Sequence, residues 1–174
     1  MQKPLVAPHG GALVDPMASP EHAQELKAAS RAWPSWDLTP RQTCDLELLL
    51  CGGFSPLGGF LGRADYESVV ERMRLADGTI WPIPIVLDLP EERASKLRKG
   101  DLLALRDAEG VMLAAMHVEE IFAPDREAEA EKVYGTSDRS HPGVRHLLES
   151  THPVCVSGRV EGIQEPAHYD FRTL

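Results

Sequence analysis

The chain has 174 residues, of which 43% are hydrophobic and 26% charged, a composition typical of a globular protein with a core of its own. Its formal net charge of -9 argues against a general nucleic-acid or membrane-surface binder, because such proteins present a dominant basic face. No run approaches the ~20 apolar residues that span a bilayer, and the first residues lack the apolar core of a signal peptide. We therefore expect a cytoplasmic protein without a nucleic-acid or membrane partner.

The three cysteines are expected to be reduced and buried, since their number is odd and no export signal precedes them. Cys44 and Cys51 lie in a predicted helix, seven residues and about 10.5 Å of helix rise apart. A disulfide needs Cα atoms within roughly 7 Å of each other, so this pair is not expected to be bridged.

The first third of the chain predicts an extended segment over 1–18, with a turn at Gly10-Gly11, and then two helices. Ser19 and Pro20 form the start signal of the first helix, whose sequence is SPEHAQELKAASR. In the second start signal, TPRQ, Thr39 is the cap and Gln42 completes a capping box. This second helix is predicted to run to about Cys51 and to stop at Gly52.

The rest of the chain alternates short helices and strands. The sequence ADYESVVERMRL predicts a helix with Tyr66, Val69, Val70 and Met73 on one face. An edge or bulged strand follows in IWPIPIVLDL, because proline cannot donate to a sheet. A hairpin over 101–122, helices over 124–135 and 141–150, and a last strand or hairpin over 153–163 complete the pattern. The fold class is α+β with a small, barrel-like sheet.

The glycine-rich stretch GGFSPLGGFL, residues 52–61, resembles a phosphate-binding loop only superficially. A P-loop needs a lysine and a hydroxyl after its last glycine, and a nucleotide fingerprint follows a strand rather than a helix. We interpret the glycines as turn residues. The apolar side chains of the stretch are then a buried hydrophobic contact made by Phe54, Leu57, Phe60 and Leu61.

Other polar residues do not complete a site. His141, His146 and His152, near Asp138, lack the spacing and the cysteines of a zinc site. His9, in PHGG, is interpreted as part of a packed turn, with a ligand-facing turn as the alternative. Four arginines flank the glycine-rich stretch, and ion pairs with Asp45, Asp65 and Glu71 explain them as well as an anion site does: Arg41, Arg63, Arg72 and Arg74.

Several segments together resemble the N-terminal domain of ATP sulfurylase (sulfate adenylyltransferase). These are the block from SWDLTPRQTCDLELLL to IVLDL at 35–89, PHGG at 8–11, ALRDAEG at 104–110 and VYGTSDRSHPGV at 133–144. The first block is most similar to the bacterial bifunctional form, in which an adenylylsulfate kinase domain follows. The resemblance implies a single PUA-like domain over 1–174, with the catalytic domain absent from this chain.

The family's catalytic motifs, Gln-x-Arg-Asn and His-x-x-His, do not occur in the sequence. The resemblance therefore implies no catalytic, cofactor-binding or metal-binding residue here, with ATP and Mg required by the full enzyme alone. It implies packing against a catalytic domain, a kinase domain or another subunit, including a homo-oligomer. The alternative is a stand-alone PUA-like binding or assembly module.

Overall fold

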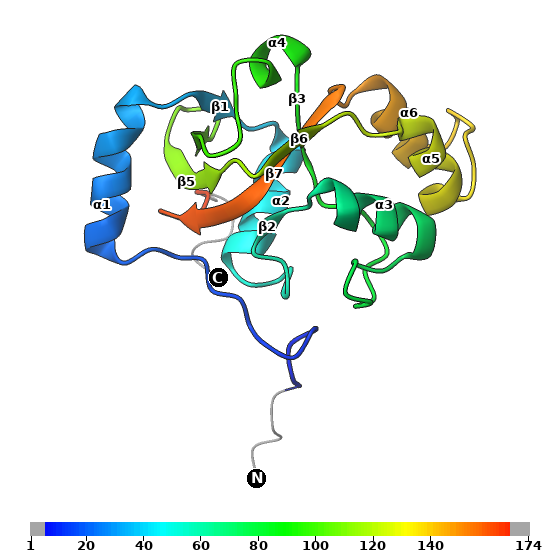
Figure 1. The fold of residues 1–174 in the computed structure, drawn as a ribbon, viewed down its shortest axis with the longest axis horizontal. Coiled ribbons are helices and arrows are strands. Elements are labelled where there is room, and N and C mark those ends of the chain that lie inside the picture. Colours follow the sequence, from blue (N-terminus) through cyan, green and yellow to red (C-terminus); the bar gives the residue numbers. More distant parts are fainter. Residues whose placement is uncertain (1–5, 168–174) are drawn as a thin grey trace. The chain divides into compact units, whose positions relative to one another are not determined.

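The helices begin at the caps that the sequence predicts. The structure is a computed structural model that describes residues 6–167. Ser19 caps the first helix, and Thr39 with Gln42 forms the predicted capping box of the second. The helices are α1 (Pro20–Ala29), α2 (Pro40–Leu50), α3 (Arg63–Arg72), α4 (Glu91–Ala94), α5 (Arg126–Tyr134) and α6 (Pro142–Glu149), with a 3-10 turn η1 (Ser30–Ala32) after α1 (Figure 1).

The strands are short except for the last. They are β1 (Ser35–Asp37), β2 (Gly59–Phe60), β3 (Leu87–Leu89), β4 (Leu102–Arg106), β5 (Met112–His117), β6 (Glu120–Phe122) and β7 (Val154–Gly162). The predicted hairpin is β4 and β5, and β6 is a separate strand after it. Together with the helices, these strands confirm the α+β class.

The described chain divides into two units. Unit 1 comprises residues 6–59, 102–117 and 159–167, and unit 2 comprises 60–101 and 118–158. Strand β7 therefore contributes its first residues to unit 2 and its last residues to unit 1.

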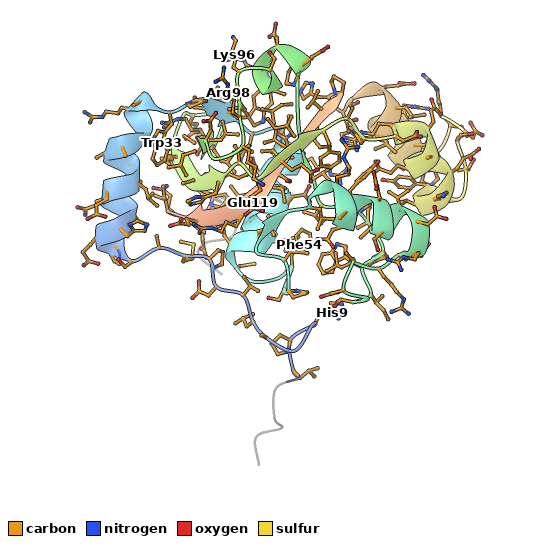
Figure 2. The ribbon with its side chains drawn as sticks, viewed as in Figure 1. His9, Trp33, Phe54, Lys96, Arg98 and Glu119 are labelled. Atoms are coloured by element: carbon orange, nitrogen blue, oxygen red, sulfur yellow. The ribbon has the colours of Figure 1, made fainter. Side chains whose placement is uncertain are left out.

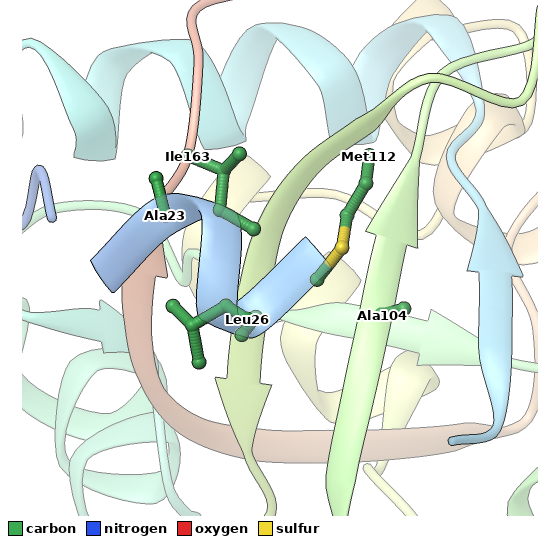
Figure 3. Close-up of a cluster of buried hydrophobic side chains, with 6 residues drawn as sticks. Ala23, Leu26, Ala104, Met112 and Ile163 are labelled. Atoms are coloured by element: carbon green, nitrogen blue, oxygen red, sulfur yellow. The ribbon is translucent and has the colours of Figure 1, made fainter. Parts of the chain in front are cut away.

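The sheet of unit 1 runs in the order β1, β4, β5 and the end of β7. Strand β1 is parallel to β4, and the other pairs are antiparallel, with Ala115 opposite Glu161. Helix α1 covers this sheet through Ala23 and Leu26, which pack against Met112 and Ile163 (Figure 3). Burial of these apolar side chains, at about 25 cal/mol per Å², stabilises the unit.

In unit 2, the start of β7 lies between β3 and β6, both antiparallel to it. Val156 is opposite Leu87 on one side and Ile121 on the other. Strand β3 is thus an edge strand, as predicted, but it is far shorter than the 80–89 segment that the composition indicated. The two prolines of that segment, Pro82 and Pro84, lack the N–H that ladder pairing requires.

Two predictions of burial are wrong. Met73 is 47% exposed, because α3 ends at Arg72 and Met73 itself takes a left-handed conformation with φ of 55°. Cys44 and Cys51 are exposed as well, since α2 turns Leu46, Leu49 and Leu50 to the core instead; only Cys155 is buried among the described cysteines. All three cysteines are unbridged, as expected.

Candidate interaction surface at the glycine-rich loop

The glycine-rich loop turns sharply after α2. Cys51 caps the helix, and Gly52 follows with φ of 75°, a left-handed conformation that favours glycine. A Cβ on Gly52 would lie 2.8 Å from both Leu13 Cδ1 and the Val14 carbonyl oxygen. Two independent features therefore require glycine at position 52: its left-handed backbone conformation and the close approach of residues 13–14.

Three backbone donors of the loop are used within the loop or by the end of α2. The amide of Phe54 donates to Leu48 O at 3.0 Å, that of Ser55 to Gly52 O at 3.0 Å, and that of Leu57 to Phe54 O at 2.8 Å. Because these N–H groups point at carbonyls of the same chain, they do not form an anion-binding cradle. The loop is a packed turn, in agreement with the structural interpretation of its glycines.

The second motif near the start of the chain, PHGG, packs against this loop. The Gly11 amide donates to Pro8 O at 3.0 Å and closes a turn, in which Gly10 has φ of 74°. A Cβ on Gly10 would lie 2.7 Å from the Pro56 ring. His9 lies in this turn and is itself exposed (Figure 2), whereas Gly10 brings the motif against a loop residue more than forty positions away in sequence.

A shallow hollow of about 630 Å³ separates the N-terminal segment from the loop. Its lining is mostly apolar: Val6, Ala7, Pro8, His9, Leu13, Gly52, Gly53 and Ser55. Val6 is 94% exposed and Leu13 66% exposed. We call these residues, all within unit 1, the apolar surface. Because exposed apolar side chains gather at this hollow, it is a candidate contact surface for another protein.

The loop buries three of the four apolar side chains that were expected to be inside. Leu57, Phe60 and Leu61 are buried, but Phe54 is only half-buried. The prediction that Phe54 is buried is therefore only partly correct, because its side chain is half-buried. Its place beside the exposed Gly53 leaves part of the ring open to solvent.

The arginines near the loop have partners of their own. Arg41 pairs with Asp45 at 3.6 Å, as expected, whereas Arg63 pairs with Glu67 at 3.8 Å and Glu120 at 3.6 Å. Arg72 donates to Ser68 Oγ at 2.7 Å, and Arg74 donates to Gly78 O at 3.0 Å. The expected pairs with Asp65 and Glu71 do not form, because those carboxylates accept from the Ala76 amide and from Lys132.

His141 and His152 are held by contacts within the fold, and His146 is half-buried on α6. His141 caps α6, accepting from the Val144 amide at 3.4 Å, and its ring lies 5.4 Å from that of Tyr134. The His152 amide donates to Asp88 Oδ2 at 2.6 Å. Over residues 6–167, no group of three or more His, Cys, Asp or Glu side chains is placed to hold a metal ion.

One buried polar network in unit 2 was not predicted. Glu129 accepts from Tyr66 Oη at 2.8 Å and from Arg126 Nη1 at 2.8 Å, and Arg126 Nη2 lies 3.5 Å from the Cys155 sulfur. Burial raises the pKa of the Cys155 thiol to about 12, so the group is an inert neutral thiol at physiological pH. Burial and the Glu129 carboxylate likewise raise the pKa of Tyr66.

A second unpredicted cluster fixes α1 to β7 in unit 1. His22 Nε2 lies 2.9 Å from Glu161 Oε2, and His22 Nδ1 lies 3.3 Å from Glu25 Oε2. Both ring nitrogens face carboxylate oxygens, so His22 satisfies both only when it carries two protons. Hydrogen bonds to Glu25 and Glu161 accordingly raise the pKa of His22.

His117 binds the other oxygen of Glu161, and Arg159 lies 3.0 Å from it. Partial burial alone raises the pKa of Glu161, but the hydrogen bonds from His117 and His22 outweigh burial and lower it. Residues 22 and 161 are 139 positions apart in the sequence, so no local pattern signals this cluster.

No helix in the described part of the chain has the length and apolar character needed to cross a membrane.

Comparison with known proteins places these features in a family. The family model for the PUA-like domain matches residues 6–165. The chain is 44% identical over 171 residues to a sulfate adenylyltransferase of Eremothecium gossypii, covering 98% of this chain and 34% of the relative. It is also 44% identical to a sulfate adenylyltransferase of Synechococcus, with 94% of this chain and 41% of that relative covered.

A solved structure described as a hexameric APS kinase from Thiobacillus denitrificans has the same fold, with a TM-score of 0.74 and 34% identity. The match covers 96% of this chain and 28% of that one. The chain thus spans between about a quarter and two fifths of the length of the proteins it matches. The predicted resemblance to the N-terminal ATP sulfurylase domain is confirmed, and the chain belongs to the PUA-like domain family.

Proposed function

We propose that this chain is the non-catalytic N-terminal domain of a sulfate adenylyltransferase, which joins ATP and sulfate to give adenosine 5′-phosphosulfate and pyrophosphate. The observation that carries the proposal is coverage: 98% of the chain aligns with 34% of a relative of that name. The catalytic motifs expected of the enzyme do not occur in the sequence. ATP and Mg²⁺ belong to the remainder of the enzyme.

The apolar surface supplies the physical reason for a partner. Val6 and Leu13 expose most of their side chains beside the hollow, and water-exposed apolar area of this kind is stabilised by burial against another surface. The partner that we propose is the catalytic domain of the same polypeptide. A domain of this kind positions the catalytic part without touching the reacting atoms.

A first experiment tests the division of labour. The purified 174-residue chain is assayed for sulfate-dependent ATP–pyrophosphate exchange with Mg²⁺, alongside the full-length Synechococcus relative as a positive control. We expect no exchange above background, because the chain lacks the cationic groups that stabilise charge at the transferring centre. Sustained exchange by the chain alone would refute a non-catalytic role.

A second experiment tests the surface. Hydrogen exchange of residues 6–14 and 52–55 is compared between the 174-residue chain and the native-length polypeptide, after an immunoblot of cell extract has established its size. Protection that appears only in the longer form supports docking at this surface. Leu13→Asp should remove that protection, whereas Val111→Asp, at an exposed turn outside the hollow, should leave it intact. Equal exchange in both forms would move the interface elsewhere.

Three finer features of the parent protein also belong to this proposal. A following adenylylsulfate kinase domain is supported by the structural relative described as an APS kinase. A homo-oligomer is supported by the description of the same relative as hexameric. A cytoplasmic location is supported by the three unbridged cysteines, which are typical of a reducing compartment.

The alternative is a stand-alone assembly module that acts in trans. The immunoblot separates the two proposals: a band far above 19.1 kDa supports a domain of a longer enzyme, and a band at 19.1 kDa supports the module.

A further inference from the structure

Unit 2 carries a compact basic segment on a chain that is otherwise strongly acidic. Four of the 18 Lys and Arg residues fall within seven positions, which leaves 14 basic against 27 acidic groups elsewhere. All four side chains are exposed: Arg93, Lys96, Arg98 and Lys99. We call these four residues the basic segment. Figure 2 shows Lys96 and Arg98 beside α4.

Within residues 6–167, the side chains of the basic segment make no hydrogen bond or ion pair. Other cations of unit 2 are engaged, for example Arg63 with Glu120, and Arg126 with Glu129. The acidic neighbours Glu91, Glu92 and Asp101 reduce the local charge, yet none lies within ion-pair distance of the four cations. The segment therefore offers four uncommitted positive charges.

The backbone of the segment is held firmly, so the four side chains extend from fixed positions. Ala94 and Leu97 are buried and anchor it to unit 2. The Arg98 amide donates to Asp101 Oδ2 at 2.7 Å, and the Gly100 amide donates to Val118 O at 2.8 Å. A surface that is already ordered loses less backbone entropy when it binds.

A complementary pair of charges lies on α5 of the same chain. Glu127 and Glu131 are exposed, stand four residues apart on one helix face, and make no ion pair within the described residues. Arg93 and Lys96 are one turn apart, since the Lys96 amide donates to Arg93 O at 3.2 Å. Side chains separated by one helical turn are about 5–6 Å apart, so the two pairs match in spacing as well as in sign.

We infer that the basic segment of one copy docks on Glu127 and Glu131 of a second copy. This inference rests on the homo-oligomer proposed above and names the surface that forms it. Electrostatic complementarity of this kind sets orientation and speeds association, and it weakens as salt screens the charges. The acidic remainder of the chain repels other arrangements, because most faces of two copies carry the same sign.

The test uses charge reversal in the 174-residue chain, with self-association measured by sedimentation velocity over a concentration series at low and high salt. The first variant, Arg93→Glu with Lys96→Glu, reverses the matched pair and cancels the net charge of the basic segment. The second, Glu127→Lys with Glu131→Lys, makes the α5 face basic. Each is expected to weaken self-association at least about tenfold, and high salt should weaken the unmodified chain similarly.

Mixing the two variants should restore association, because the intact basic segment of the second meets the intact α5 face of the first. A control with the same charge change, Arg31→Glu with Arg139→Glu, should associate like the unmodified chain. All variants change exposed side chains, and circular dichroism verifies that each is folded.

Three results would overturn the inference. These are an unmodified chain that stays monomeric at every concentration, association that neither reversal weakens, and a control that weakens it as much as the designed pairs. A native-length protein that oligomerises while the reversals have no effect would refute this contact alone and leave the proposed function standing.

Discussion

The buried Ser55 hydroxyl accepts a hydrogen bond from the Val14 amide at 3.0 Å and donates one to Gly52 O at 2.7 Å. One small side chain thus ties the N-terminal segment to the glycine-rich loop and closes the loop on itself. Because both partners are backbone groups, the contact fixes the path of the chain on both sides of the hollow.

Ser55→Ala is expected to lower the free energy of unfolding by about 1–3 kcal/mol, because it leaves buried backbone groups without their partner. Urea denaturation measures the change. The control is Ser95→Ala, where an exposed hydroxyl donates to Glu92 O at 3.3 Å, and it should stay within about 0.5 kcal/mol. Equal losses of unfolding free energy in the two variants would show that the Ser55 hydroxyl does not hold the two segments together.

Gly52→Ala and Gly135→Ala form a matched pair. Their φ angles are 75° and 71°, but a Cβ meets residues 13–14 at 2.8 Å only at Gly52, while nothing lies within 4 Å at Gly135. Gly135→Ala should cost about 1–2 kcal/mol from its left-handed backbone alone. Gly52→Ala should lower the free energy of unfolding by clearly more, and it should raise the rate of amide hydrogen exchange at residues 6–14. Identical melting temperatures for the two variants would mean that the N-terminal segment moves away from the new Cβ without loss of stability.

The phenylalanines of the loop should differ in importance. Phe60 is 3% exposed, so Phe60→Ala is expected to cost about 3–5 kcal/mol through lost burial and a residual cavity. Phe54→Ala should lower the free energy of unfolding by less, because Phe54 is only half-buried. Chemical denaturation of both variants decides the order, and a larger loss at Phe54 would contradict the packing described here.

The Glu129 carboxylate should contribute more to the free energy of unfolding than the Tyr66 hydroxyl that it binds. Tyr66→Phe removes one hydrogen bond and is expected to cost about 1–2 kcal/mol. Glu129→Gln leaves the Arg126 charge without its partner and is expected to cost about 3–5 kcal/mol. Denaturation of the two single variants measures both values, and a Glu129→Gln chain as stable as Tyr66→Phe would show that Arg126 finds another counter-charge.

The His22–Glu161 contact predicts a defined pH window. The pKa of His22 is raised above its ordinary 6.5, so its contribution is complete below pH 6.5 and is lost as pH rises through the folded value. The pKa of Glu161 is lowered below its ordinary 4.5, so its contribution is complete above pH 4.5 and is lost as pH falls through the folded value. The stabilising contributions of His22 and Glu161 are therefore both complete between about pH 4.5 and 6.5.

The stability difference between the unmodified chain and His22→Gln should therefore be largest in that window and should fade toward pH 8.5. Melting temperatures across the pH series measure it, and an NMR titration of the His22 ring gives the pKa directly. Both groups are partly exposed, so added salt should shrink the difference. A difference that is constant with pH would mean that His22 acts through packing alone.

Local signals explain what could be predicted from the sequence. Helix starts at Ser19 and Thr39 and stops at Gly52 depend on residues within four positions, and each occurs where the pattern indicates. The sequence alone also shows that the motifs Gln-x-Arg-Asn and His-x-x-His do not occur in this chain. Membership of the PUA-like family required a resemblance, because no single spacing in the chain encodes it.

Long-range packing explains what could not be predicted. The contacts Gly10–Pro56, Tyr66–Glu129 and His22–Glu161 join residues 46, 63 and 139 positions apart. The predicted helix ADYESVVERMRL ends at Leu75, three residues beyond the end of α3, since a hydrophobic period does not reveal where a helix ends without a cap. The assignment of 1–174 to a single domain stays a prediction.

The division of each unit into separate stretches of sequence has a consequence for synthesis on the ribosome. The chain leaves unit 1 after Gly59, returns at Leu102, leaves after His117 and returns at Arg159. The sheet of unit 1 therefore gains its last strand only when the end of β7 has been made. Until then, the cluster of α1 and β5 lacks Ile163, and β5 lacks its partner strand β7, so completing unit 1 requires pairing between residues far apart in the sequence.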